Sequence, residues 1–320
     1  MRPSGKLHLG HLHGALSNWV KLQETYECFY FVADWHALTT EYEDTSKIKS
    51  DAEEMVIDWL AAGIDPEKTT IFVQSQLPEH AELHILLSMI TPLSWLERCP
   101  TYKEQLKEVK TRDLSTYGFL GYPVLQSADI LIYKADRVPV GEDQLPHLEL
   151  TREIARRFNY FYGNVFVEPQ AILTQIPKMP GNDGRKMSKS YGNCIFLSDE
   201  PAEISKKIST YITDPARIHP TDVGHPDVCA LFELNKVYLE NCQEVAELCK
   251  AGKIGCVKCK KVLAEKIITS LKPFQDRRRE IKKNPKIINR ILKDGSMRAR
   301  LTAQKTMSEV RKAVKLWNME

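Results

Sequence analysis

The stretch that decides the fold is a short apolar run, CFYFVA, at residues 28–33. An uninterrupted apolar run of this length is typical of a β-strand that is buried on both faces. Residues 12–20 precede it with apolar side chains at helical spacing. The same order recurs in a helix predicted over residues 51–62 and a strand predicted over 70–73. Buried strands that alternate with helices predict a parallel sheet covered by helices.

This alternation continues to about residue 197. Residues 137–140, RVPV, predict a further strand, and residues 142–158 predict the helix that follows it. The fold class is therefore α/β, with a doubly wound parallel-sheet (Rossmann-like) first domain over residues 1–197. A loop rich in proline, glycine and asparagine, residues 177–184, lies near its end.

The remaining residues carry no strand-like run. Five prolines separate segments of helical length, at Pro201, Pro215, Pro226, Pro273 and Pro285. The sequence therefore predicts an all-α C-terminal domain over residues 198–320. Its last helix, predicted within residues 296–317, is expected to pack back on the first domain.

Composition excludes several classes of protein. The 320 residues are 42% hydrophobic and 27% charged, which is typical of neither disordered chains nor disulfide-rich miniproteins. No apolar run approaches the roughly 20 residues that span a bilayer. Residues 1–6 lead into a polar stretch without the apolar core of a signal peptide. We expect a cytosolic protein with no membrane contact.

The net charge of +3 hides an asymmetry along the chain. Residues 1–249 hold 24 Lys and Arg against 36 Asp and Glu, a balance of −12, whereas residues 250–320 hold 21 against 6, a balance of +15. A basic segment of this kind is typical of a surface that binds a polyanion, although solvated helix faces would give the same count.

The eight cysteines fit metal binding better than disulfides, because thiols stay reduced in the cytosol. Five of them crowd into 31 positions: Cys229, Cys242, Cys249, Cys256 and Cys259. Only one C-x2-C pair is present, where a zinc ribbon would have two. Four thiolates at uneven spacing suit a four-iron four-sulfur cluster equally well.

The first candidate functional motif is HLGH at residues 8–11. Gly10 lets a ligand approach the backbone, and a helix start offers free N–H groups to phosphate. His8 and His11 can donate hydrogen bonds to phosphate oxygens. Taken alone, the motif fits two surface histidines near a helix start equally well.

The second motif is KMSKS at residues 186–190, with Arg185 just before it. Three cations and two hydroxyls on a glycine-rich loop suit the binding of a triphosphate whose charge moves during a reaction. A solvated basic loop is the alternative, and it becomes the weaker one beside the first motif.

Together the two motifs resemble the ATP-binding motifs of class I aminoacyl-tRNA synthetases. Three further segments are similar to motifs of bacterial tryptophanyl-tRNA synthetases: FVADWHA at 31–37, YPVLQSADIL at 122–131 and GEDQ at 141–144. The resemblance extends through nearly the whole chain. The GEDQ form separates this group from its tyrosine-specific relatives.

The resemblance implies a tryptophan–tRNA ligase that works in two steps. The carboxylate of L-tryptophan attacks the α-phosphorus of ATP bound with Mg²⁺, and the terminal 2′-hydroxyl of tRNA(Trp) then attacks the adenylate. His8, His11, Lys186 and Lys189 are expected to stabilise the phosphates in the transition state. A homodimer is the expected assembly, and residues 198–320 are expected to bind the anticodon.

The same match implies residues that bind ATP. They lie in three segments: Arg2, Pro3, Ser4, Gly10 and His11; Gly141, Glu142 and Asp143; and Arg185, Lys186, Met187, Ser188, Lys189 and Ser190. The Asp143 carboxylate is expected to accept hydrogen bonds from the ribose hydroxyls, and a helix N-cap is its alternative role.

Asp129 is expected to select tryptophan, because the indole N–H is only a donor and needs a buried acceptor. A salt bridge to an arginine or lysine is the alternative role for Asp129. Tyr122, His36, Gln126 and Gln144 are expected to line the same pocket by the same match.

The resemblance extends to the cysteines, since some members of the family carry a 4Fe-4S cluster in the helical domain. It implies Cys229, Cys249, Cys256 and Cys259 as ligands of an iron-sulfur cluster, with a structural zinc ion as the alternative. Cys242 competes with Cys229 as the fourth ligand, and we expect it to lie within a helix instead. Phosphate contacts are predicted for the basic residues of segment 277–283.

The family has a short strand before the turn at residues 2–5, whereas this sequence begins at Met1. Added upstream residues are therefore expected to raise stability and activity. Two other functions remain: a tyrosine-specific relative, which amino-acid-dependent pyrophosphate exchange would reveal, and a non-catalytic tRNA-binding protein with a redox cluster. Both ATP motifs stand against the latter.

Overall fold

The computed structural model describes residues 1–100, 102–103, 113–173 and 179–317. Up to residue 173, the helices that position the site are α1 (Leu9–His11), α2 (Ser17–Leu22), α3 (Asp34–Glu41), α4 (Ile48–Ala62), α5 (Glu79–Ser88), α6 (Leu93–Glu97), α8 (Tyr117–Leu131) and α9 (Leu145–Tyr162). The later helices are α10 (Pro201–Ser209), α11 (Ala230–Tyr238), α12 (Cys242–Lys250), α13 (Cys256–Lys283) and α14 (Lys286–Ala313).

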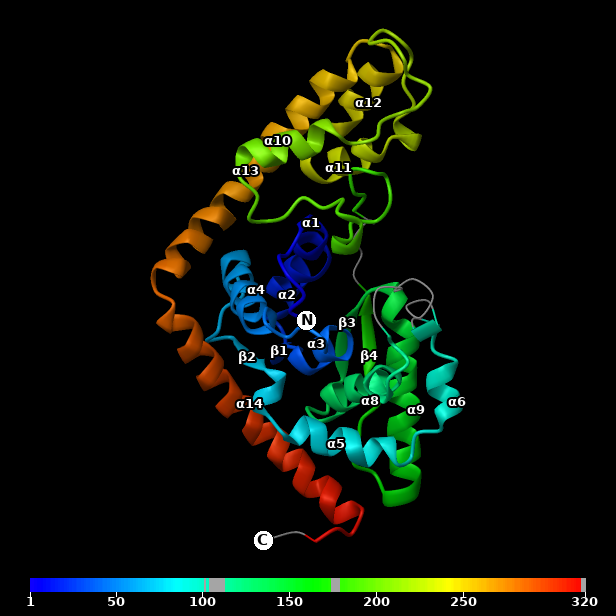
Figure 1. The fold of residues 1–320 in the computed structure, drawn as a ribbon, viewed down its shortest axis with the longest axis vertical. Coiled ribbons are helices and arrows are strands. Elements are labelled where there is room, and N and C mark those ends of the chain that lie inside the picture. The colour runs from blue at the N-terminus through cyan, green and yellow to red at the C-terminus, as the bar shows by residue number, and fades with distance from the viewer. Residues whose placement is uncertain (101, 104–112, 174–178, 318–320) are drawn as a thin grey trace.

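The molecule is elongated, as Figure 1 shows. The strands lie in the middle, α10 to α12 form one end together with the first part of α13, and α14 returns along one side of the strands. No helix within the described ranges is both long and apolar enough to cross a bilayer.

Four strands are described, and they form two parallel pairs. β1 (Cys28–Val32) pairs with β2 (Thr69–Val73), and β3 (Arg137–Val140) pairs with β4 (Gln170–Leu173). The hydrogen bonds divide the described strands into these two pairs rather than joining them in one sheet. Parallel strands alternating with helices confirm the predicted α/β class. β4 escaped prediction because only three apolar residues mark it and its two end residues are exposed.

The first residues of the chain run beside β1. The Met1 nitrogen donates to the carbonyl of Phe31 (2.7 Å), and the amide of Ala33 donates to the carbonyl of Met1 (2.9 Å). This pairing places the turn at residues 2–5 at the carboxyl end of β1. Ligands of α/β proteins bind at that end of the strands.

Helices alone follow residue 198 in the described ranges, as predicted. Pro273, however, lies inside α13 and does not end a helix. A proline removes one hydrogen bond from a helix, and the neighbouring side chains of Leu271 and Phe274 are buried in the core on either side of it. Packing therefore holds α13 together across the proline.

Helix α14 is longer than predicted and lies against the strands. It begins ten residues earlier, at Lys286, directly after Pro285. Gly295 is so close to β2 that a β-carbon there would lie 1.8 Å from the carbonyl oxygen of Ile71. Leu301 is 71% exposed, so it lies off the packed face of the helix.

The buried apolar side chains form two clusters. The first joins the HLGH segment, α4 and β1 to α10, α11 and α13. The second joins Phe72 of β2 to α5, α8, α9 and α14. The first cluster takes side chains from both sides of residue 197, so the two predicted domains share a core.

Candidate functional site

Two histidines of the HLGH motif cap the first helix with their rings. His8 is the N-cap of α1, and its Nδ1 accepts from the amide of Gly10 (3.1 Å), while Nδ1 of His11 accepts from the amide of His8 (3.2 Å). Because each Nδ1 accepts, the proton of each neutral ring is on Nε2. Burial lowers the pKa of His8 to about 4 and that of His11 to about 2. Two uncharged Nε2–H donors therefore lie at the start of α1.

Gly10 is required by this arrangement. A β-carbon at position 10 would lie 2.9 Å from Cε1 of His8, so any larger residue would displace the His8 ring. Gly10 was predicted to leave room for a ligand, and in the structure it leaves room for the capping ring of His8.

The KMSKS loop, residues 186–190, is brought to the HLGH motif by the segment that follows it. The amide of Leu9 donates to the carbonyl of Ile195 (3.1 Å), and the amide of Leu197 donates to the carbonyl of Leu7 (2.9 Å). Segments 186 and 190 residues apart in sequence thus pair side by side, and the two predicted ATP motifs meet.

Lys189 connects the loop to the turn at residues 2–5. Its Nζ donates to the carbonyl oxygens of Ser4 and Gly5, at 2.9 Å each. The amide of Ser4 donates to the carbonyl of Arg2 (3.0 Å), which closes the turn. Burial lowers the pKa of Lys189, because an ammonium group loses hydration there.

The other polar side chains of the loop are on its outer side. Lys186 is exposed, and the hydroxyls of Ser188 and Ser190 lie 2.8 Å apart. The guanidinium of Arg185 lies over the ring of Tyr191, 4.0 Å from its centre. Cations and hydroxyls are thus available on one exposed loop beside the histidine donors.

Met187 differs from its neighbours in the loop in the direction of its side chain, and its contact with ATP stays a prediction. Its side chain is buried in the first core cluster, and its amide donates to the carbonyl of Met179 (2.9 Å). The side chain therefore anchors the loop and does not face the site where ATP was predicted. The alternation of the chain in this extended segment explains why Met187 points inward while its neighbours point outward.

The GEDQ segment, residues 141–144, directly follows β3. The Asp143 carboxylate covers Gly141, where a β-carbon would lie 2.6 Å from Oδ1 of Asp143. Helix α9 begins later, with Gln144 as its N-cap and no side-chain cap, so the capping alternative for Asp143 is wrong. Nε2 of Gln144 donates to Asp143 (3.3 Å). Asp143 and Glu142 remain exposed at the end of the strand.

Asp129, the predicted selector of the amino acid, is 4% exposed at the centre of a hydrogen-bond network. Oδ1 accepts from Nε2 of Gln74 and lies 2.7 Å from Nδ1 of His80, while Oδ2 lies 2.8 Å from Nε2 of His36. Burial alone would raise the pKa of Asp129, but the hydrogen bonds from His36 and His80 lower it to about 2. These partners replace the arginine or lysine of the salt-bridge alternative.

The network gathers residues from the carboxyl ends of two neighbouring strands. His36 lies on α3, which follows β1, and Gln74 directly follows β2. Gln74 and His80 escaped prediction. Gln74 could have been found, because it is the first polar residue after a strand that is buried on both faces.

Tyr122 lies beside His36. The two ring centres lie 6.5 Å apart, and the Tyr122 hydroxyl lies 2.9 Å from Nε2 of His147. Gln126 is half-buried one turn further along α8, between Tyr122 and Asp129. The structure thus places Tyr122, Gln126 and Asp129 along one face of α8 beside His36, whereas Gln144 is bonded to Asp143.

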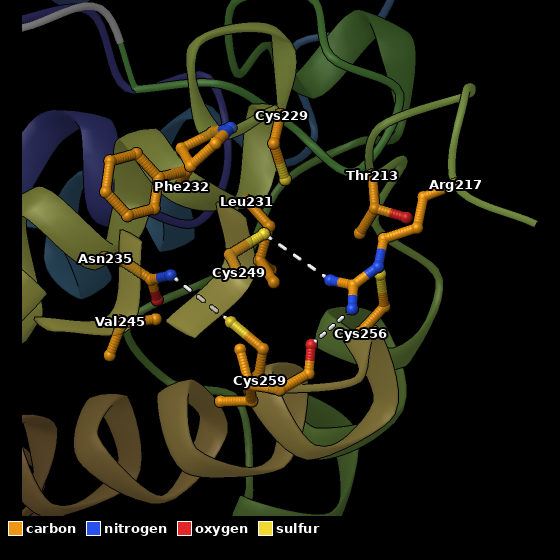
Figure 2. A pocket seen from close by; sticks show the side chains of 12 residues that line it. Thr213, Arg217, Cys229, Leu231, Phe232, Asn235, Val245, Cys249, Cys256 and Cys259 are labelled. Atoms are coloured by element: carbon orange, nitrogen blue, oxygen red, sulfur yellow. Dashed lines mark hydrogen bonds between the residues drawn. The ribbon is translucent and has the colours of Figure 1, made fainter. Parts of the chain in front are cut away.

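A pocket of about 30 Å³ lies among α11, α12 and the start of α13, as Figure 2 shows. The four cysteines predicted as ligands line it: Cys229, Cys249, Cys256 and Cys259. Cys242 is the first residue of α12 and is not among the lining residues. All eight cysteines are free thiols.

Nitrogen donors point at two of the pocket sulfurs. Nη1 of Arg217 lies 3.4 Å from Sγ of Cys249, and Nδ2 of Asn235 lies 3.4 Å from Sγ of Cys259. Burial raises the pKa of Cys259 and of Cys249. No three His, Cys, Asp or Glu side chains within the described ranges are arranged to hold a single metal ion.

The basic segment 277–283 is largely occupied by contacts with α4. Arg278 and Lys282 pair with Asp58 and Glu54, at 2.6 Å for Arg278 to Asp58 and for Lys282 to Glu54. Arg277 donates to the carbonyl of Ala61 at the end of α4 (2.7 Å). These three side chains are turned toward α4 in the structure, and their phosphate contacts stay a prediction.

The chain matches known proteins along nearly its whole length. The family described as "tRNA synthetases class I (W and Y)" matches residues 1–272. A tryptophan–tRNA ligase of Thermotoga maritima is 55% identical over 320 residues, covering 99% of this chain and 98% of that protein. One of Aquifex aeolicus is 46% identical over 388 residues, with coverages of 99% and 98%.

A solved structure is similar as well. The crystal structure of tryptophanyl-tRNA synthetase from Campylobacter jejuni, complexed with ADP and tryptophan, is 33% identical and gives a TM-score of 0.88. It covers 99% of this chain and 98% of that one.

Proposed function

Because the chain belongs to the class I tRNA synthetases of the tryptophan and tyrosine group, we infer that it joins L-tryptophan to tRNA(Trp) with consumption of ATP. The observation that carries this function is the 55% identity to a tryptophan–tRNA ligase over 99% of the chain. Class I chemistry has two steps, formation of tryptophanyl-AMP with release of diphosphate and transfer of the tryptophanyl group to tRNA.

ATP binding is proposed at the meeting point of the two motifs. The Nε2–H groups of His8 and His11 are uncharged donors, so they bind phosphate oxygens without adding charge to the ground state. Lys189 donates to two backbone carbonyls, and we propose that it exchanges them for oxygens of the departing diphosphate. Mg²⁺ on the phosphates would neutralise charge as it develops. Lys186, exposed on the same loop, assists Lys189.

The adenosine is proposed to bind beyond β3. The exposed Asp143 carboxylate follows the strand directly, and it is an acceptor for ribose hydroxyls. Gly141 brings the backbone close to the same place. The ATP phosphates then lie between the end of β3 and the two histidines that cap α1.

The amino acid is proposed to bind between Tyr122, His36 and Asp129. The ionised Asp129 carboxylate accepts the indole N–H, because an acceptor buried in the pocket wall rejects substrates that lack that donor. The reaction needs no protein nucleophile, since both attacking oxygens belong to substrates. Positioning and charge stabilisation supply the catalysis.

The activity is tested by tryptophan-dependent exchange of labelled diphosphate into ATP. Exchange with tryptophan and not with tyrosine is expected, followed by charging of tRNA(Trp). Exchange with tyrosine alone would favour the tyrosine-specific alternative. Absence of exchange with either would favour a tRNA-binding protein.

A 4Fe-4S cluster bound by Cys229, Cys249, Cys256 and Cys259 is part of the proposal. A zinc ion needs its sulfurs about 2.3 Å from one point, whereas a cluster is larger and needs a space between sulfurs that are further apart. Two observations support the cluster. A cavity of about 30 Å³ is lined by the four thiols, and N–H groups of Arg217 and Asn235 donate to two of the sulfurs. Bound there, it would cross-link α11, α12 and α13.

Residues 1–197 are proposed as the catalytic domain and residues 198–320 as the anticodon-binding domain. A cytosolic homodimer completes the proposal. Exposed apolar side chains at Ile85, Met89 and Leu93, at steps of four residues near α5 and α6, support a surface for a second copy. Light scattering of the purified protein would give twice 36.7 kDa for this dimer.

A further inference from the structure

A chain of hydrogen bonds leads from Asp129 into the core. His80, on α5, is fully buried, and its Nδ1 lies 2.7 Å from Oδ1 of Asp129. On the other side of the ring, Nε2 lies 2.7 Å from the hydroxyl of Tyr133. None of the ATP or RNA functions above uses His80 or Tyr133.

The proton positions in this chain follow from the charge of Asp129. An ionised carboxylate only accepts hydrogen bonds, so Nδ1 of His80 donates to it. In the neutral ring Nε2 is then an acceptor, and the hydroxyl of Tyr133 donates to it. Each group in the chain from Tyr133 through His80 to Asp129 thus has one role.

The position of the His80 ring is fixed by aromatic neighbours. Its centre lies 5.8 Å from that of Phe31, 6.0 Å from that of Phe72 and 5.5 Å from that of Tyr133. Rings packed on several sides of a buried imidazole leave it no alternative rotamer without a cavity. His80 therefore presents its Nδ1–H at one fixed point.

The two oxygens of Asp129 differ in occupancy. A carboxylate has about four acceptor sites, and Oδ1 already has two partners, His80 and Gln74. Oδ2 has one partner, His36. The remaining acceptor site is on Oδ2, which is the oxygen on the side of His36 and the pocket.

We propose that His80, supported by Tyr133, is a positioning residue that determines the selection of tryptophan. By holding Oδ1, it fixes the rotation of the Asp129 carboxylate and directs the free acceptor site of Oδ2 at the indole N–H. This inference rests on the proposed function and deepens it.

The test compares two substrates in the amino-acid-dependent exchange assay. One is tryptophan, and the other is β-(benzothiophen-3-yl)alanine, which replaces the indole N–H by sulfur and removes the donor. The quantity measured is the kcat/KM for tryptophan divided by the kcat/KM for the analogue. A merely structural role would lower both values together and leave this ratio unchanged.

Two substitutions at His80 form a matched pair. In H80N the amide nitrogen is as many bonds from Cβ as Nδ1, so the donor to Asp129 is retained. In H80Q the nitrogen corresponds to Nε2, so that donor is lost. Y133F removes one hydroxyl with little change of volume and leaves Nε2 of His80 unpaired.

The ratio is expected to fall roughly 5- to 150-fold in H80Q, which corresponds to the loss of a buried hydrogen bond, and to change less in H80N. The ratio in Y133F is expected to lie between those of H80Q and H80N. An H80Q ratio equal to that of the wild type overturns the proposal. If H80Q does not fold, an unchanged ratio in Y133F overturns it. Failure of the wild type to exchange with tryptophan refutes the proposed function instead.

Discussion

Two side-chain clusters, one around Asp129 and one around the four cysteines that line a cavity, differ in how their hydrogen-bonding groups are satisfied. Around Asp129 the chain itself provides the donors, since Gln74, His36 and His80 contact the carboxylate. Around the four cysteines, side-chain nitrogens of Arg217 and Asn235 reach two of the sulfurs, and a cavity of about 30 Å³ lies among the thiols. Folding alone provides the contacts of Asp129, whereas the proposed 4Fe-4S cluster would complete the cysteine cavity.

Substitutions are therefore expected to have different effects on function and on stability in the two clusters. Replacing a pre-formed acceptor such as the Asp129 carboxylate removes its hydrogen bond to the substrate, while the surrounding protein keeps its fold through other contacts. A pocket completed by an added group loses that group when one ligand is removed, and the helices that the group joins are then loosened.

The largest effect is expected at the cysteine pocket. In C259S the iron content of anaerobically purified protein should fall to near zero, together with the visible absorbance, because a serine oxygen is a poor substitute for a thiolate ligand. C242S is the matched control, since Cys242 is not among the residues that line the pocket, and it should keep both. Equal iron in C259S and the wild type would contradict the ligand set, and zinc in place of iron would select the alternative metal.

The second effect is expected in D129N. Asparagine keeps the shape but places an NH₂ group against the donors of His80 or Gln74, and buried donors that face each other are unsatisfied. The kcat/KM for tryptophan in the exchange assay should fall by about 10³-fold, as expected for a site built to bind a substrate N–H. D294N, on the exposed face of α14, is the control. An activity within a few-fold of the wild type would mean that another group reads the indole.

The third effect separates the two lysines of the KMSKS loop. K189M should lower the kcat/KM for ATP by about 10²-fold, which is the range for loss of one group that stabilises transition-state charge. K189M also removes the contacts with Ser4 and Gly5, so it should lower the melting temperature, whereas K186M should not. A K186M protein that melts as early as K189M would show that the turn contact contributes no stability. K272M on exposed α13 controls for the loss of one charge.

The sequence predicted what depends on local pattern. Continuous apolar runs identified β1 and β2, and the family resemblance implied the four thiols that line one cavity. It could not predict Gln74, His80 and Tyr133 as partners of one carboxylate, because they meet only when α5 and α8 pack behind β2. Charge counts could not predict the ion pairs of Arg278 and Lys282 with α4, because a run of like charges does not show which face of a helix it lies on. The inward direction of the Met187 side chain was also not predicted, because one inward side chain in a polar motif has no periodic signal.

The smallest effect tests the pre-formed side of the comparison through pH. His8 and His11 have folded pKa values of about 4 and about 2, below the unfolded value near 6.5. The unfolded chain therefore takes up protons below pH 6.5 while the folded chain does not, so stability is complete above pH 6.5 and falls as pH decreases toward 4. Between pH 7.5 and 5.5 each histidine should remove about 1 kcal/mol from the free energy of unfolding. H11N keeps an acceptor for the amide of His8 and removes one titrating ring, so urea unfolding should show a pH dependence smaller by about that amount. H219N, at an exposed histidine, should not change the dependence, and an unchanged dependence in H11N would mean that the His11 ring is not held neutral by folding.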